Sequence, residues 1–366
     1  MGFITHCYGD KRGANLTEVI FEDKQRHLVI QRSSSFTPQF VEFLQRIVWG
    51  SRGVKYTIHN VADTLNRLSN PHFLSLTENG QLVAVTTLNQ KTTHLAGNTY
   101  PAIYSYGISV DVSKRRLGYG TLIAEQRLQY GLSKIGEKGL FYGYIEATNT
   151  NSLKTNTKVG SESIGQYHIL VISRLGPMDN PRFQRLQATR RDQLVQLLSV
   201  QYENHALLDL EQSVEPENYY ILEQNNEIVT GLQCERHQLT VRHLSGAAGQ
   251  TIVTLLPHIP VLRRLFPERN LHFLRFGNIY AKKGREAEIF NLMEALLARY
   301  QVNFGLIYMD KRSPVYQQLK AVGKFGVFNA LVEVPVYVMA FLKGFSANEV
   351  ADILSQPLFI SMMDPV

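Results

Sequence analysis

A strand, a short basic loop with two glycines and a helix follow one another around residues Ile108–Ser133, and this stretch restricts the fold more than any other. β-Branched and aromatic residues from Ile103 to Val112 predict the strand. The loop that follows contains Arg115-Arg116-Leu117-Gly118-Tyr119-Gly120, which reads R-x-x-G-x-G. Apolar residues at helical spacing between Leu122 and Ile135 predict the helix.

The loop has the chemistry of an anion site. Glycines tolerate positive φ and carry no Cβ, so the backbone N–H groups of the loop can turn inward beside the basic flank. These donors lie at the start of a helix, where unpaired N–H groups and the helix dipole favour negative charge. The combination suits a pyrophosphate. It is neither a P-loop, which needs Lys-Ser/Thr after the last glycine, nor the dinucleotide fingerprint G-x-G-x-x-G.

A second motif lies downstream of the loop. Gly139–Thr148 predicts the next strand, the segment from Asn149 to Lys154 begins another helix, and Lys158-Val159-Gly160 ends it. In this order and spacing, the first half of the chain resembles the GCN5-related N-acetyltransferases, which often show N-x-x-A and K-x-G after the R-x-x-G-x-G loop. Asn149, Ser152, Lys158 and Gly160 occupy the corresponding positions.

The resemblance implies an α/β fold with a mixed sheet, acetyl-CoA as co-substrate, and transfer of the acetyl group to a primary amine of a small molecule or peptide by direct attack. It also implies cofactor-binding residues. Backbone groups of Ile108, Ser109 and Val110 would contact the pantetheine. Arg115, Arg116, Leu117, Gly118, Tyr119 and Gly120, with Thr121, would hold the pyrophosphate, and Asn149 and Ser152 would flank the pantetheine arm.

The catalytic side chains are less well defined than the cofactor loop. The family often places a tyrosine seven residues after the asparagine as the acid for the leaving thiolate, but this chain has Asn156 there. Glu146, at the end of its strand, is the first candidate base, acting through a water, although a solvated carboxylate is an equally good reading. Tyr106 lies on the central strand near the expected thioester, where core packing is the alternative. No His/carboxylate pattern predicts a metal.

The order of elements repeats after a linker at Pro177–Pro181. We therefore predict two tandem acyl-CoA N-acyltransferase folds, with domains at residues 1–176 and 177–345 and a tail at residues 346–366. The second copy lacks R-x-x-G-x-G and has only 282–286, KKGRE, between strand and helix. Its one glycine, and Glu286 at the helix start, predict that it binds no pyrophosphate. Residues 1–26 show no clear pattern.

Composition limits the environment and the partners of the chain. Its 366 residues contain only two cysteines, Cys7 and Cys234, which argues against a disulfide framework and predicts a reducing, cytoplasmic compartment. The most apolar run, Val332–Leu342, is too short to span a bilayer, so no membrane partner is expected. Residues 1–177 carry 19 Lys and Arg against 12 Asp and Glu, whereas the remainder carries 19 of each. The excess therefore accompanies the phosphate-type loop, and no basic helix indicates nucleic acid.

Three functions remain open at this stage. The first is an N-acetyltransferase. The second is a tandem acyl or aminoacyl transferase with another donor, because two fused copies resemble the N-myristoyltransferases and the peptidoglycan aminoacyl transferases. The intact loop argues against the latter. The third is a non-catalytic CoA-binding module, favoured by Asn156 and the degenerate second copy. The tail is apolar, and a sharper hypothesis places the carboxylate of Val366 in the acceptor pocket. A homo-oligomer is compatible with the sequence.

Overall fold

The computed structural model describes residues 17–50, 54–244, 270–326, 329 and 335–365. Its first half contains strands β1 (Thr17–Asp23), β2 (Leu28–Ser33), β3 (Val54–Ile58), β4 (Pro71–Glu78), β5 (Gln81–Leu95), β6 (Asn98–Val110), β7 (Gly139–Glu146) and β8 (Glu162–Ser173), and helices α1 (Pro38–Arg46), α2 (Val61–Asn66), α3 (Tyr119–Lys134) and α4 (Thr150–Lys158). Its second half contains strands β9 (Phe183–Arg185), β10 (Tyr219–Gln224), β11 (Glu227–Leu244), β12 (Asn270–Ala281), β13 (Phe304–Met309) and β14 (Val336–Lys343), and helices α5 (Arg191–Gln201), α6 (Leu210–Ser213), α9 (Glu286–Arg299), α10 (Pro314–Val322) and α11 (Ala347–Ser355).

The two halves repeat one pairing pattern. In the first, β4, β5 and β6 are antiparallel and β6 then runs parallel to β7; in the second, β10, β11 and β12 are antiparallel and β12 runs parallel to β13. A helix connects each parallel pair: α3 in the first half and α9 in the second. This repeat confirms the prediction of two tandem copies with mixed sheets.

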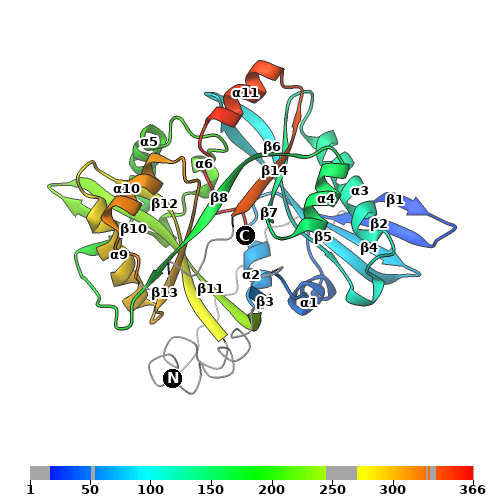
Figure 1. Cartoon of the computed structure of the whole chain (residues 1–366), viewed down its shortest axis with the longest axis horizontal. Coiled ribbons are helices and arrows are strands. Elements are labelled where there is room, and N and C mark those ends of the chain that lie inside the picture. The colour runs from blue at the N-terminus through cyan, green and yellow to red at the C-terminus, as the bar shows by residue number, and fades with distance from the viewer. Residues whose placement is uncertain (1–16, 51–53, 245–269, 327–328, 330–334, 366) are drawn as a thin grey trace.

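The last strand of each copy is exchanged between the halves. β14, from the end of the chain, lies between β7 and β8 and is antiparallel to both. The far end of β8 pairs with β13 of the second half. Within the described residues, the strands therefore form one sheet in the order β1-β2-β4-β5-β6-β7-β14-β8-β13-β12-β11-β10-β9, with β3 beside β11. Figure 1 shows β14 inserted at the centre. The division at residue 176 stays a prediction, because pairing crosses it.

Helices cover both faces of the first half of the sheet. α3 packs on one face with Ile123 and Leu128 over β4 and β5, and α1 and α2 pack on the other with Phe40 and Leu65. The start of α1 follows from its sequence, since Thr37 Oγ1 accepts a hydrogen bond from Phe40 N at 3.3 Å and proline takes the first helical turn. The R-x-x-G-x-G loop, at the start of α3, thus lies on the face opposite α1 and α2.

Three strands differ from the sequence-based expectations. β1 lies in a segment without clear periodicity and pairs with β2. β3 pairs with β11 of the second half, far away along the chain. β14 lies in the apolar run around Val332–Leu342, which the sequence analysis judged too short to span a bilayer but did not predict as a strand. Each of these strands is defined by its partner in the sheet more than by its own residues.

Candidate functional site

The site begins where β6 and β7 part. The two strands pair in parallel only through Ala102–Tyr104 and Leu140–Tyr142. Beyond that point β6 is irregular, because the register with β5 shifts between the Val85 and Thr87 pairs. This shift is a β-bulge in β6 that contains Gly107. The φ of Gly107 is +63°, and a Cβ added at this position would lie 3.1 Å from the Trp49 ring. The bulge needs glycine there, and it leaves β6 backbone groups facing an opening instead of a neighbouring strand.

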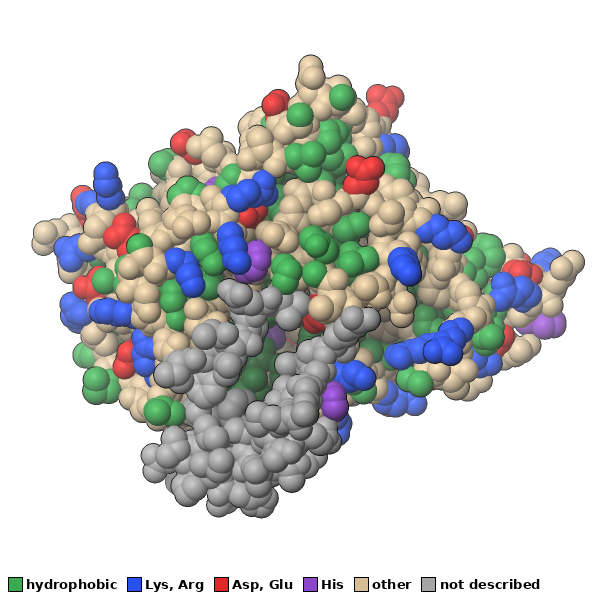
Figure 2. Space-filling model, viewed as in Figure 1, with side chains coloured by type: hydrophobic (Ala, Val, Ile, Leu, Met, Phe, Trp, Pro, Cys, Tyr) green, Lys and Arg blue, Asp and Glu red, His purple; other side chains and the backbone are tan. Residues whose placement is uncertain are grey.

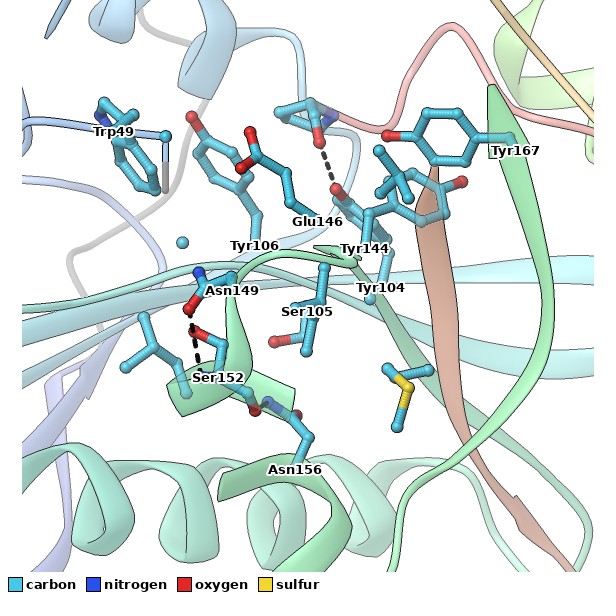
Figure 3. A pocket seen from close by; sticks show the side chains of 18 of the residues that line it. Trp49, Tyr104, Ser105, Tyr106, Tyr144, Glu146, Asn149, Ser152, Asn156 and Tyr167 are labelled. Atoms are coloured by element: carbon cyan, nitrogen blue, oxygen red, sulfur yellow. Dashed lines mark hydrogen bonds between the residues drawn. The ribbon is translucent and has the colours of Figure 1, made fainter. Parts of the chain in front are cut away.

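A cavity of about 210 Å³ fills this opening and is shown in Figure 3. It is lined from β6 and β7, from the start of α4, from the tail, and from elements that the sequence analysis did not connect with it, among them β3 and β14. Eight of the lining residues are aromatic, namely Trp49, Phe141 and six tyrosines. The tyrosines among them are Tyr56, Tyr104, Tyr106, Tyr144, Tyr167 and Tyr308.

The R-x-x-G-x-G loop has the conformation of a helix N-terminal anion site. Gly118 is the N-cap of α3 with φ +88°, and Arg116 also takes a positive φ of 68°. The side chains of Arg115 and Arg116 are exposed, and Leu117 is 52% exposed. The loop therefore offers the backbone N–H groups of the first turn of α3, from Tyr119 through Gly120 to Thr121, beside two accessible cations.

The side chain of Tyr119 does not point to the loop surface. Its ring is buried, and its hydroxyl donates a hydrogen bond to Glu78, which also forms an ion pair with Lys114 at 2.5 Å. Glu78 lies at the end of β4, so these contacts attach the loop to the β4–β5 hairpin. Tyr119 therefore contributes its backbone N–H to the loop, and its side chain anchors the loop to the β4–β5 hairpin.

The start of α4 holds the downstream motif. Asn149 caps the helix, its Oδ1 accepting a hydrogen bond from Ser152 N at 3.2 Å, and both residues line the cavity. Asn156, one turn further, is buried; its Nδ2 donates to Ser152 O at 2.8 Å and its Oδ1 accepts from Arg127 at 2.7 Å. Asn156 is thus a fixed amide at the position of the family's tyrosine acid, and Arg127 is a cavity residue that the sequence analysis missed.

The two predicted catalytic side chains lie at the same end of the cavity (Figure 3). Tyr106 stacks on Trp49 with ring centroids 6.0 Å apart, and burial raises the pKa of Tyr106 to about 12. Its hydroxyl therefore stays protonated at neutral pH and is a donor, not a base. Glu146 is half-buried at the end of β7. Tyr56 lines the cavity as well, and its pKa is raised first by burial and then by the charge of Glu146.

The chain's last described residues reach the cavity through tyrosines of β6 and β7. The hydroxyl of Tyr104 donates a hydrogen bond to the carbonyl of Pro365, and Pro365 lines the cavity. The hydroxyls of Tyr142 and Tyr144 donate to Asp364 Oδ2 at 2.7 and 2.8 Å. The hypothesis about the carboxylate of Val366 concerns a residue outside the described part of the chain. The apolar character of the tail was the one sequence signal of this docking.

In the corresponding loop of the second copy, a backbone donor and a cation are already paired with carboxylates of the chain itself. Glu286 Oε1 accepts a hydrogen bond from Gly284 N at 3.1 Å, so an acidic group already uses a donor at the start of α9. Lys282 pairs with Glu227 at 2.6 Å. These contacts agree with the prediction that the second copy lacks a pyrophosphate loop.

Two other features of the described residues bear on partners. No group of three or more His, Cys, Asp or Glu side chains in the described ranges could hold a metal ion, and no helix among them is long and apolar enough to cross a membrane. Figure 2 shows Lys and Arg scattered among acidic and apolar side chains on the face that it presents.

Comparison with solved structures finds the same architecture over nearly the whole chain. Two crystal structures of Saccharomyces cerevisiae N-myristoyltransferase with bound myristoyl-CoA match with TM-scores of 0.56 and 0.57 and 11% identity; they cover 98% and 96% of this chain and 92% and 91% of theirs. The GCN5-related glucosamine N-acetyltransferase region of a fungal multi-domain GH3 β-N-acetylglucosaminidase matches with a TM-score of 0.51 and 12% identity, over 78% of this chain and 35% of that one. No family model and no curated protein sequence matches. The chain has the tandem acyl-CoA N-acyltransferase fold.

Proposed function

We propose that this chain is an N-acyltransferase that moves a short acyl group, acetyl in the simplest case, from coenzyme A to a primary amine. One observation carries the proposal: the parted strands β6 and β7 enclose a cavity, and β6 continues from it into the R-x-x-G-x-G loop at the N-terminus of α3. The tandem fold supports it, because the yeast protein of the same architecture was solved with an acyl-CoA bound. No metal takes part in this proposal.

The donor is held along the line from α3 to the cavity. The first-turn N–H groups of α3, with Arg115 and Arg116, bind the pyrophosphate. Backbone groups of Ile108, Ser109 and Val110 bind the pantetheine, and Asn149 and Ser152 flank it at the start of α4. The thioester then lies at the bulge, where an unpaired β6 N–H stabilises the oxyanion.

The reaction is aminolysis of the thioester. The amine nitrogen forms a bond to the carbonyl carbon, the C–S bond breaks, and coenzyme A leaves as the thiolate. A free ammonium has a pKa of about 10.4, so a base must take its proton before attack. Glu146 takes this proton through a water, and Tyr106 donates a hydrogen bond to the incoming group. Asn156 carries no acidic proton, so the thiolate leaves without a dedicated acid.

Calorimetric titration with acetyl-CoA tests the donor site. We expect one site per chain, lost in the Arg115→Ala/Gly118→Ala double variant. Gly284→Ala, at a glycine of the second copy with φ +84°, is the matched control and should bind as wild type does. Two sites would refute the silent second copy, and no binding would refute the proposed function.

A turnover assay then separates an enzyme from a binding module. Thiol release is followed with a panel of small amines and peptide N-termini, with Glu146→Gln as the variant. We expect release that depends on the amine and falls at least about tenfold in the variant. Binding without release on any amine would favour the CoA-binding module.

A further inference from the structure

Arg127 is a buried cation without an anionic partner. It lies on α3 and is 5% exposed. Its guanidinium donates one hydrogen bond to Ser105 Oγ and another to Asn156 Oδ1 at 2.7 Å, both neutral acceptors. Its Nε is buried and has no hydrogen-bond partner, and no carboxylate among the described residues forms an ion pair with it.

Such an arrangement is unfavourable for a side chain with a purely structural role. Removing a charge from water costs several kcal/mol unless an opposite charge offsets it, and buried arginines are normally paired. The Phe141 ring, 5.5 Å from the guanidinium, offsets only part of this cost. Burial lowers the pKa of Arg127 to about 9, so the group still carries its charge at neutral pH. A bound anion would complete the site.

The position of Arg127 selects where that anion comes from. The guanidinium lines the cavity on the α3 face of the sheet. Ser105, its partner, points to this face, whereas its neighbours Tyr104 and Tyr106 point to the opposite one, where Trp49 and Pro365 lie. In the proposed function the amine approaches on the tyrosine face, because Tyr106 and Glu146 lie on that side of the cavity. The group that reaches Arg127 is therefore the far end of the acyl chain, which extends from the thioester between β6 and β7.

The surroundings of the guanidinium are polar as well. Ser105, Asn156 and Ser161 line the same end of the cavity and are buried. A long alkyl chain would leave the cation without an anionic partner in a polar pocket, which is costly. This end of the cavity therefore differs from what a myristoyl chain requires.

We propose that Arg127 binds the terminal carboxylate of a short dicarboxylic acyl group carried by coenzyme A, so that the donor is of the succinyl-CoA class. This inference rests on the proposed function and specifies its donor. The chemistry is the same aminolysis: the C–N bond forms, the C–S bond breaks, and the distal carboxylate stays on Arg127 and then leaves on the product amide.

The test compares succinyl-CoA with butyryl-CoA, which has the same number of acyl carbons and no carboxylate. Binding to the full chain is measured by calorimetry for wild type, Arg127→Gln and Arg115→Gln. A charged hydrogen-bonded pair predicts that wild type binds succinyl-CoA about tenfold or more tightly than butyryl-CoA. Arg127→Gln should bring the ratio near one. Arg115→Gln, the loop control, should weaken both esters and keep the ratio.

The outcomes separate this inference from the function beneath it. If wild type binds both esters equally, or prefers butyryl-CoA, the inference is overturned and the proposed function stands. An Arg127→Gln variant that weakens both esters by the same factor also overturns it, since that result describes a structural arginine. If neither ester binds, the proposed function fails and the inference fails with it. The wild-type ratio decides the matter even if the variant does not fold.

Discussion

Replacing Lys91 by methionine tests whether the tail is held by charge. Lys91 lies on β5 and is buried, with Nζ 2.7 Å from Asp209 Oδ2 and 2.6 Å from Asp364 Oδ1. Burial alone would lower the pKa of Lys91, but the two carboxylates outweigh it and raise that pKa. Ser361 Oγ donates to Asp209 Oδ2 at 2.8 Å, so Lys91 joins the first half to the tail directly through Asp364 and indirectly through Asp209.

The magnitude follows from what the substitution leaves behind. Lys91→Met removes the one cation between two carboxylates that are each 0% exposed at the side chain. Breaking a buried ion pair from one side costs about 3–5 kcal/mol of unfolding free energy. Asp364→Asn retains the Lys91–Asp209 pair one to one, so it should cost less, about 1–2 kcal/mol.

The sign of the pH dependence is a second check. Burial raises the pKa of Asp209 against the lowering effect of Lys91, and without the lysine it rises further. A carboxyl group whose folded-state pKa is raised contributes stability below its unfolded pKa of about 3.9 and loses it as pH rises. The deficit of Lys91→Met relative to wild type should therefore be greatest near neutral pH and shrink towards pH 4.

Urea unfolding at pH 7 and at pH 5 measures both effects. Lys282→Met is the matched control, because Lys282 forms an ion pair of similar length with Glu227 on the surface, and it should leave the midpoint unchanged. A Lys91→Met deficit below about 1 kcal/mol, or one that grows at lower pH, would show that the network does not hold the tail by charge.

Three further predictions concern the fold around the site. Gly107→Ala should cost about 1–3 kcal/mol more than Gly97→Ala in urea unfolding, because both positions have positive φ but only the former brings a Cβ against a ring. Burial lowers the pKa of His72 to about 4, so wild type should lose roughly 2.5 kcal/mol from that residue as pH falls from 6.5 to 4, and a thermal scan of His72→Gln should show a shallower loss. A fragment of residues 1–176 lacks β14 and should show no cooperative thermal transition, whereas a two-state transition would mean that β7 and β8 pair without it.

Local signals in the sequence were sufficient to predict the first-copy hairpin and the helix start at the R-x-x-G-x-G loop. Asn79 and Gly80 both take positive φ, of 51° and 78°, as a two-residue hairpin turn requires. The helix after the loop begins at the glycine that the motif marks. In each case the residues that determine the conformation are neighbours in the chain, so the pattern alone was enough to predict it.

Most of the residues that line the cavity could not be predicted from local sequence patterns. Tyr106 and Glu146 were found because they flank the motif, but Trp49, Tyr167 and Pro365 reach the cavity only through tertiary contacts. Arg127 reads in the sequence as an ordinary helical arginine, and nothing local shows that its face of α3 is covered. A one-residue bulge at Gly107 likewise depends on β5, with which β6 pairs.

The exchange of β14 explains why the site needs the whole chain. β14 supplies Val336 and Met339 to the cavity wall. α11 then leads into the tail, whose Pro365 carbonyl accepts a hydrogen bond from the Tyr104 hydroxyl. The R-x-x-G-x-G loop is encoded by adjacent residues, yet part of the cavity wall comes from the last 31 residues described, 335–365. Pairing between β7 and β14 joins segments separated by most of the second copy, and such contacts form late because loop closure is costly. The degenerate second copy therefore has a structural reason to persist: it carries β14 and the tail into the site of the first.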